Sequence, residues 1–234
     1  YLGDSSDDLL VARVWRTDNA ASIAGSPTVG YSNAGWTELS SSTNGTNGFL
    51  AYGYCQNGQC GYDDFVVSPA GQPGVGPGHT NELWLGGSMN YDELVAYNGL
   101  PPRSNGRAVI RTTNGGALAP DVSWQDMTGT IGSAPRFPIT GGIHPDEHAV
   151  VFNPTDTGIA FVGSDGGVVR VDVRNPRNAS AACSTRRFVY NNGHGAEPLG
   201  PADLLDCQRL LSGIPTAITP LNDGLNTIQF QSLS

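Results

Sequence analysis

The sequence has no lysine, few charged residues and no long apolar run. Its 12 basic residues are all arginines, they are outnumbered by 21 acidic residues, and the formal net charge is −9. Beyond the pair Arg186 and Arg187 the arginines do not cluster, so the basic face that a phosphate backbone requires is missing and nucleic-acid binding is not expected. No segment approaches the ~18 consecutive apolar residues of a transmembrane helix, so no membrane span is expected either.

Charged residues make up 14% of the chain and hydrophobic residues 38%. Because an average protein has ~25% charged residues and because this apolar content is enough for a buried core, a coiled coil and an acidic disordered chain are both excluded. Glycine and proline, with 32 and 16 residues, occupy about a fifth of the 234 positions, against about 12% in average proteins. The composition therefore predicts a turn-rich, all-β fold. One short helix is predicted at residues 201–212, with proline in its first turn and Gly213 as the stop.

A pattern of short apolar strands recurs along the chain. Residues 65–69 and 150–154 match each other about 85 residues apart, and each is followed by an apolar run that ends in glycine and serine. A further strand, a turn and a tryptophan-bearing strand complete the first of these units at residues 108–128. The second half of the unit also occurs within residues 2–39, and residues 227–234 look like the first strand of another unit.

Such units predict β-propeller blades of four antiparallel strands with long loop insertions. We expect a blade remnant at 1–60, a blade at 61–140, a blade with a disulfide-pinned insertion at 141–224 and the first strand of a further blade at 225–234. A propeller closes with roughly four to eight blades. The ring in this chain is therefore expected to be incomplete, and either the remaining blades of a longer protein or partner chains would close it.

The four cysteines fall into two local groups, Cys55 with Cys60 and Cys183 with Cys207. Neither spacing is that of a zinc site, which favours C-x₂-C pairs or nearby histidines. Two disulfides, 55–60 and 183–207, are the preferred pairing among three possible connectivities. Disulfides indicate an oxidising compartment, so a secreted, extracellular protein is expected. No metal and no cofactor are expected.

Two turns resemble the Asp box, Ser/Thr-x-Asp-x-Gly-x-x-Trp, of BNR-repeat propellers. They comprise residues 111–116 with Trp124 and residues 16–21 with Trp36, and asparagines 114 and 19 stand where the box has aspartate. This family includes sialidases, xyloglucan-cleaving glycoside hydrolases and sortilin-type receptors. The resemblance implies a propeller fold and either glycan or protein binding or glycoside hydrolysis.

Three ordered motifs, at residues 143–154, 162–170 and 221–230, are also similar to a run seen in secreted bacterial proteins of the BNR-like or glycoside-hydrolase-like type. By the common route, glycoside hydrolysis needs two carboxyl groups facing each other across a sugar. Asp146 and Asp165 are the candidate catalytic pair. Asp165 also has a structural interpretation, because an Asp-Gly pair between two apolar strands favours a tight hairpin turn.

Residues 144–148 combine two histidines with two acidic residues. In an extended segment His144, Asp146 and His148 share one face, and this arrangement is compatible with a structural hydrogen-bond cluster, a ligand contact or a metal site. Asp64 and two tyrosines that flank an inserted loop, Tyr91 and Tyr97, are further candidate ligand-binding residues. Three functions stay open: a carbohydrate- or protein-binding scaffold, a glycoside hydrolase, and a structural subunit of an extracellular assembly.

Overall fold

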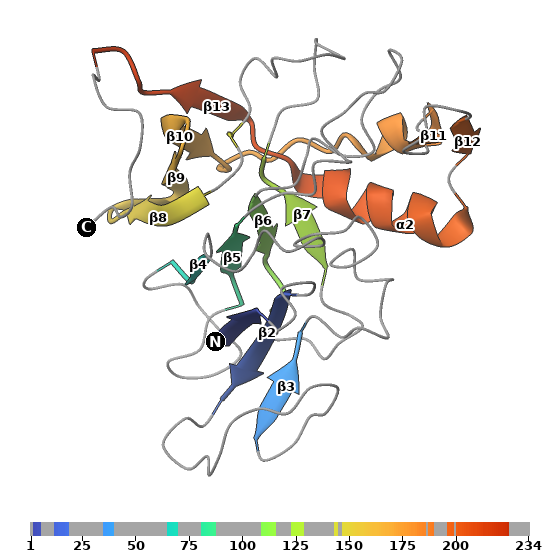
Figure 1. Ribbon diagram of the computed structural model, residues 1–234, viewed down its shortest axis with the longest axis horizontal. Helices are drawn as coiled ribbons and strands as arrows, with labels where there is room; N and C mark the ends of the chain where they lie inside the picture. Colours follow the sequence, from blue (N-terminus) through green and yellow to red (C-terminus); the bar gives the residue numbers. More distant parts are fainter. Residues whose placement is uncertain are drawn as a thin grey trace.

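The computed structural model describes residues 2–5, 12–18, 35–39, 65–69, 81–87, 109–115, 123–128, 143–144, 147–185, 187–189, 196–198 and 200–224. Most of the described elements are strands in antiparallel sheets, and helices are few, so the predicted all-β class is confirmed. Figure 1 shows the sheets following one another along the chain, with the one α-helix of the described residues beside them. Among the described residues the sheets do not close a ring.

The first two sheets follow the chain order of their strands. The first contains β1 (Leu2–Ser5), β2 (Ala12–Thr17) and β3 (Trp36–Glu38). The second contains β4 (Phe65–Val67), β5 (Leu83–Gly86), β6 (Val109–Thr112) and β7 (Trp124–Asp126). Within each of these two sheets, neighbouring strands in the chain pair antiparallel with one another. These strands lie where the sequence repeat predicts them.

The third sheet has the order β13-β10-β9-β8. Its strands are β8 (Glu147–Asn153), β9 (Asp156–Ser164), β10 (Gly167–Asp172) and β13 (Ala217–Pro220). The insertion between β10 and β13 contains η5 (Ser180–Thr185), the pair β11 (Arg187–Val189) and β12 (Ala196–Pro198), α2 (Pro201–Leu210) and η6 (Leu211–Gly213). The predicted short helix is therefore confirmed, and its last residues form a 3₁₀ turn.

The strand registers show that the second and third sheets are built alike. One row of directly paired residues in the second sheet is Val67, Trp84, Arg111 and Gln125, and the corresponding row in the third is Val151, Phe161, Arg170 and Thr219. Each row thus carries valine, an aromatic residue, arginine and a polar residue in the same order. The first sheet continues the pattern, because Arg16 on β2 pairs with Thr37 on β3.

A backbone hydrogen bond beyond the last strand also repeats in all three sheets. The amide of Leu39 donates to the carbonyl of Val14, that of Met127 to Val109, and that of Leu221 to Val168, with N···O distances of 2.8, 2.9 and 2.9 Å. The three leucine or methionine positions are therefore equivalent, as are the three valines. This equivalence relates the paired residues of one sheet to those of the next.

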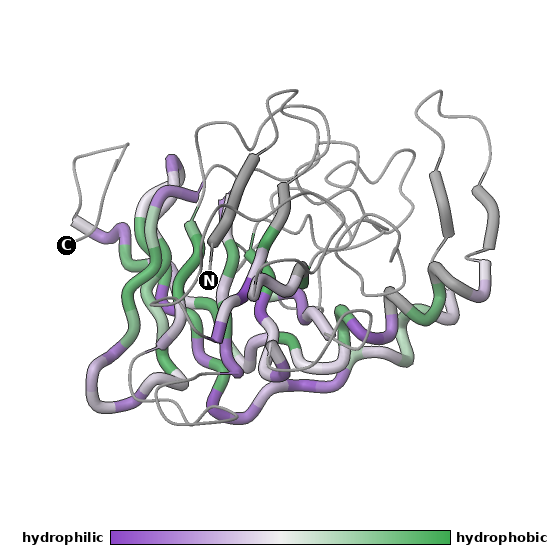
Figure 2. Tube along the Cα trace, turned by 90° about the horizontal axis from the view of Figure 1, so that it is seen from below, coloured by the Kyte–Doolittle hydropathy of each residue, from purple (hydrophilic) through white to green (hydrophobic). Residues whose placement is uncertain are grey.

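The core lies between the second and third sheets. Trp84 is 0% exposed, and its ring meets Phe152 of β8 edge-on, with ring centroids 5.4 Å apart. Val109 and Met127 from the second sheet and Val162 from the third belong to the same buried cluster. Figure 2 shows the hydrophobic strands of these sheets running side by side. Because β8 contacts both β4 and β5, the first strand of the third sheet covers one face of the second.

The insertion packs against the outer strand of the second sheet. Both α2 and η6 contact β7, and a Cβ on Gly213 would come within 2.6 Å of the Gln125 carboxamide, so this side chain would have to move for any other residue at position 213. Cys183 in η5 is disulfide-bonded, and η5 contacts α2, the helix that contains Cys207. The pairing of these two cysteines stays a prediction, and Cys55 and Cys60 lie outside the described residues.

Candidate functional site

Three segments that are distant in sequence meet at the turn between β9 and β10, formed by Asp165 and Gly166. His148 on β8 donates a hydrogen bond from Nε2 to Oδ1 of Asp165 over 2.7 Å. His144, which precedes β8, lies against the glycine: a Cβ at Gly166 would come within 2.4 Å of the His144 Cβ. Asn222, which follows β13, binds the turn through its carboxamide. The three motifs identified in the sequence thus supply the residues of one small region.

Asn222 fixes the backbone of this turn. Its Oδ1 accepts a hydrogen bond from the amide of Val168 at 2.9 Å, and its Nδ2 donates one to the carbonyl of Gly166 at 2.7 Å. Gly167 has a φ of +103°, a conformation that residues with a side chain rarely adopt. The predicted tight Asp-Gly turn is confirmed, and the asparagine adds a brace that holds Asp165 in place.

The exposure of the side chains defines what the turn offers to a ligand. The Asp165 side chain is 40% exposed, whereas that of His148 is 13% exposed. Glu147, the first residue of β8, lies between the two histidines in the sequence and is fully buried. A half-exposed carboxylate oriented by an imidazole accepts hydrogen bonds from hydroxyl, amide or cationic groups. The arrangement therefore provides a rigid polar contact point rather than an open acidic loop.

The structure brings together three of the residues that the sequence singled out, namely His144, His148 and Asp165. The other candidates, Asp64, Asp146, Tyr91 and Tyr97, lie outside the described residues. Sequence reasoning missed Asn222. Its signal is an asparagine at the end of a strand, since such side chains readily bond to neighbouring backbone groups.

A metal was one of the alternatives for the histidine-rich segment. In the part of the chain that the structure describes, no group of three or more His, Cys, Asp or Glu side chains is arranged to hold a metal ion. The pairing of His148 with Asp165 supports the hydrogen-bonding interpretation of this segment. Asp146, which belongs to the same segment, lies outside the described residues.

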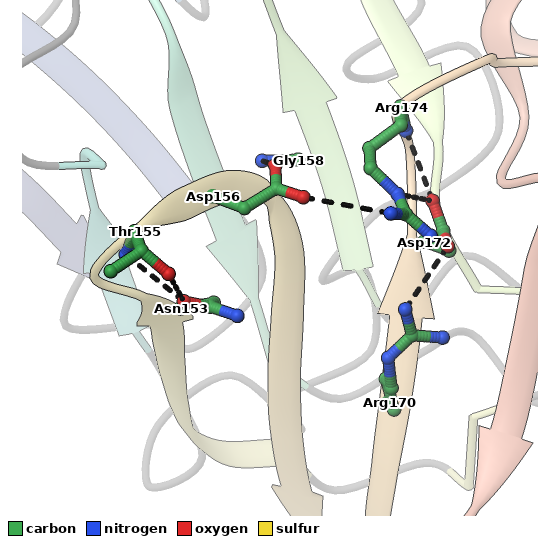
Figure 3. A network of polar contacts seen from close by, with 7 residues as sticks. All are labelled: Asn153, Thr155, Asp156, Gly158, Arg170, Asp172 and Arg174. Atoms are coloured by element: carbon green, nitrogen blue, oxygen red, sulfur yellow. Dashed lines mark hydrogen bonds and ion pairs between the residues drawn. The ribbon is translucent and has the colours of Figure 1, made fainter.

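The opposite end of the third sheet carries a second polar network (Figure 3). Arg174 bonds Asp172 through its main-chain N–H and its guanidinium, and Arg170 donates from Nη2 to Oδ2 of Asp172 at 3.1 Å. Mainly through the Arg174 side chain, these contacts hold the pKa of Asp172 well below that of an ordinary carboxyl, although burial acts in the opposite direction. Asp156 lies 3.7 Å from Arg174. This network stabilises the charged form of Asp172 and links residues of β9 and β10 at this end of the sheet.

The turn that resembles an Asp box is held by Asn114. Its Oδ1 accepts hydrogen bonds from the Thr112 hydroxyl at 2.8 Å and from the amide of Ser123 at 2.9 Å, just before β7. An aspartate carboxylate at this position would accept the same two bonds.

The aromatic residue in the second sheet is oriented by a buried acid. Glu82 Oε1 accepts from Trp84 Nε1 at 2.9 Å and from Arg111 Nε at 2.8 Å, and the arginine lies over the indole ring, 5.9 Å from its centroid. Trp84 is thus a core residue and not a surface for stacking sugars.

Among the described residues no helix is both long and apolar enough to cross a bilayer. The polar groups at the two ends of the third sheet differ in kind: one end has a carboxylate neutralised by arginines, and the other a half-exposed carboxylate beside histidines. The chemistry of the second end is the stronger basis for a functional site. Comparisons of the chain with protein-family models, with curated proteins and with solved structures give no match.

Proposed function

We propose that this chain is part of a secreted β-propeller and that it binds a carbohydrate or protein ligand through the edge of its sheets that contains the β9–β10 turn. The observation that carries the proposal is the His148–Asp165 pair, which leaves the carboxylate half-exposed on a turn braced by Asn222. Rigid frames with functional groups on their connecting loops are a common design for recognition.

The register equivalence supports a propeller. Each of the three sheets carries arginine on the corresponding strand, at residues 16, 111 and 170. Successive sheets also contact each other, since β4 contacts β1, and β8 contacts β4 and β5. Blades around a common axis pack against their neighbours in this way. Three units are fewer than a ring requires, so further blades or partner chains complete it.

By the same equivalence we expect three further candidate residues, Asp64, Tyr91 and Tyr97, near the edge of the sheets that carries the β9–β10 turn. Residues 87–108, which include Tyr91 and Tyr97, join β5 to β6 and so correspond to the β9–β10 turn. Asp64 directly precedes Phe65, whose counterpart Ala149 directly follows His148. Both connections therefore start from the edge of the array that carries Asp165, and together they enlarge the proposed binding face.

Binding without turnover fits the described carboxylates better than hydrolysis. Glu147 is fully buried and therefore cannot reach a substrate. Asp172 has a lowered pKa because of Arg174, which makes it a poor proton donor. A hydrolase of the xyloglucanase-like type would need Asp146 as the partner of Asp165. It stays the second candidate, favoured by the proximity of a half-exposed carboxylate to two histidines.

A binding experiment with xyloglucan and β-glucan oligosaccharides tests the proposal. We expect titration calorimetry to give a measurable Kd for the wild type and about a tenfold or greater loss of affinity for His148→Ala and Asp165→Asn, the size expected from losing a hydrogen bond to a charged group. Asp156→Asn, an exposed carboxylate at the opposite end of the sheet, is the matched control and should bind normally.

Two results would count against this assignment. Affinities that are the same for all four proteins, or no binding by any of them, would remove the β9–β10 turn as a glycan site. Release of reducing sugar by the wild type that disappears in a folded Asp146→Asn variant would instead establish the hydrolase.

A further inference from the structure

The outer face of the third sheet, which points away from the second sheet, is partly exposed and carries apolar residues around Arg170 and Thr219. We define its apolar part by Ala149, Val151, Phe161, Val168 and Leu221, which lie on the opposite side of the sheet from the residues of the buried cluster. Val151 is 41% exposed and Leu221 is 39% exposed. Apolar residues on one face of an antiparallel sheet are normally covered by another part of the structure.

The equivalent positions in the other two sheets are buried. Leu39 and Met127 correspond to Leu221 through the repeated backbone hydrogen bond, and both are 0% exposed. Trp84, which corresponds to Phe161, is also fully buried. The three sheets therefore present the same kind of face, and it is the third whose face is left partly open among the described residues.

Phe152 shows how such a face is covered. It belongs to β8, the first strand of the third sheet, and it packs edge-on against Trp84 of the second sheet. In the sequence repeat, residues 150–152 correspond to residues 228–230, which read Ile-Gln-Phe. Phe230 is therefore the counterpart of Phe152, and Phe161 is the counterpart of Trp84.

We propose that residues 227–230 form the first strand of a further unit and cover the outer face of the third sheet, with Phe230 packed against Phe161 and Ile228 on the same side. The inference rests on the repeat organisation used in the proposed function, and it does not depend on what the β9–β10 turn binds. It assigns an interaction surface to a segment of this chain rather than to a foreign partner.

The length of the connection suits this assignment. Leu221 is fixed beside Val168 at the far strand of the sheet, and Gly224 has a φ of +83°, which permits a reversal of the chain. Nine residues from Leu221 to Phe230 span up to about 30 Å when extended. The distance across a four-stranded sheet is about 15 Å, so the segment reaches β8 and β9 with length to spare.

A double-mutant cycle on the full chain tests the contact. We expect Phe230→Ala to lower the melting temperature by about 3–8 °C in the wild type, and by clearly less when Phe161 is already alanine, because the two rings lose the same contact. Gln229→Ala is the matched control: it lies on the opposite side of the proposed strand and should change the melting temperature little in either background.

The outcomes separate the possible occupants of the face. Additive effects of Phe230→Ala and Phe161→Ala, or no effect of Phe230→Ala, would overturn the proposal. If Phe161→Ala does not fold, Val151→Ala takes its place in the cycle. Sedimentation that shows a dimer dissociated by Val151→Asp would assign the face to a second copy instead. Loss of glycan binding by His148→Ala is a separate readout, so the two proposals fail independently.

Discussion

Gly167 is the position at which one methyl group should disturb the β9–β10 turn most. Its φ is +103°, and a Cβ there would lie 2.1 Å from the Asn222 Oδ1. A left-handed backbone costs a residue with a side chain about 1–2 kcal/mol. Displacing Asn222 also removes two hydrogen bonds of about 1 kcal/mol each. We therefore expect Gly167→Ala to lower the free energy of unfolding by about 3–4 kcal/mol.

Gly224 provides a matched control for the backbone part of this cost. Its φ is +83°, but no atom lies within 4 Å of a Cβ built on it. Gly224→Ala should therefore cost about 1–2 kcal/mol, from the backbone alone. Urea unfolding followed by tryptophan fluorescence measures both variants, and in an Asn222→Ala background the cost of Gly167→Ala should fall to that of Gly224→Ala. Equal costs for the two glycines in the wild-type background would show that Asn222 does not brace the turn.

Two further predictions concern the polar contacts elsewhere in the sheets. Because its hydrogen bonds with Arg174 lower the pKa of Asp172, this carboxylate contributes stability above the unfolded pKa of about 3.9 and loses it as the pH falls below that value. Asp172→Asn should therefore be destabilising near pH 7, and chemical denaturation should show the difference from wild type narrowing toward pH 2; a constant difference would contradict the ion-pair explanation. Asn114→Ala should lower the free energy of unfolding by about 1–2 kcal/mol, whereas Asn114→Asp keeps both accepted hydrogen bonds and should stay within about 0.5 kcal/mol of wild type.

The repeat predicted the strands because their apolar residues lie in short, turn-bounded runs. Leu83–Gly86 and Trp124–Asp126 are strands where expected, and the helix begins at Pro201 as its capping pattern predicts. β13 was not identified individually within its predicted unit. It contains one buried apolar residue, Ile218, and its pairing with β10 spans an insertion of more than forty residues. Local sequence therefore carries little signal for it.

The residue types of the site were predictable, but their contacts were not. An extended segment places His144 and His148 on one face, yet nothing in that spacing selects Asp165, 17 residues further on, as the partner of His148. This contact follows from the β8–β9 register, which includes an irregularity between Glu147 and Ala149. Asn222 depends on the position of β13 in the same way. Contacts across strands become visible only once the register is known.

The two ends of the third sheet hold their acidic residues in opposite ways, and this contrast separates stability from binding. At one end Asp172 is 8% exposed and accepts hydrogen bonds from two arginines, so its carboxylate stabilises the fold and is not open to a ligand. At the other end Asp165 accepts a hydrogen bond from His148, and its side chain is 40% exposed. Replacing Asp172 should therefore change unfolding while leaving ligand affinity intact, and replacing Asp165 should do the reverse. A shared response of both properties to either change would mean that the two ends act as one structural unit.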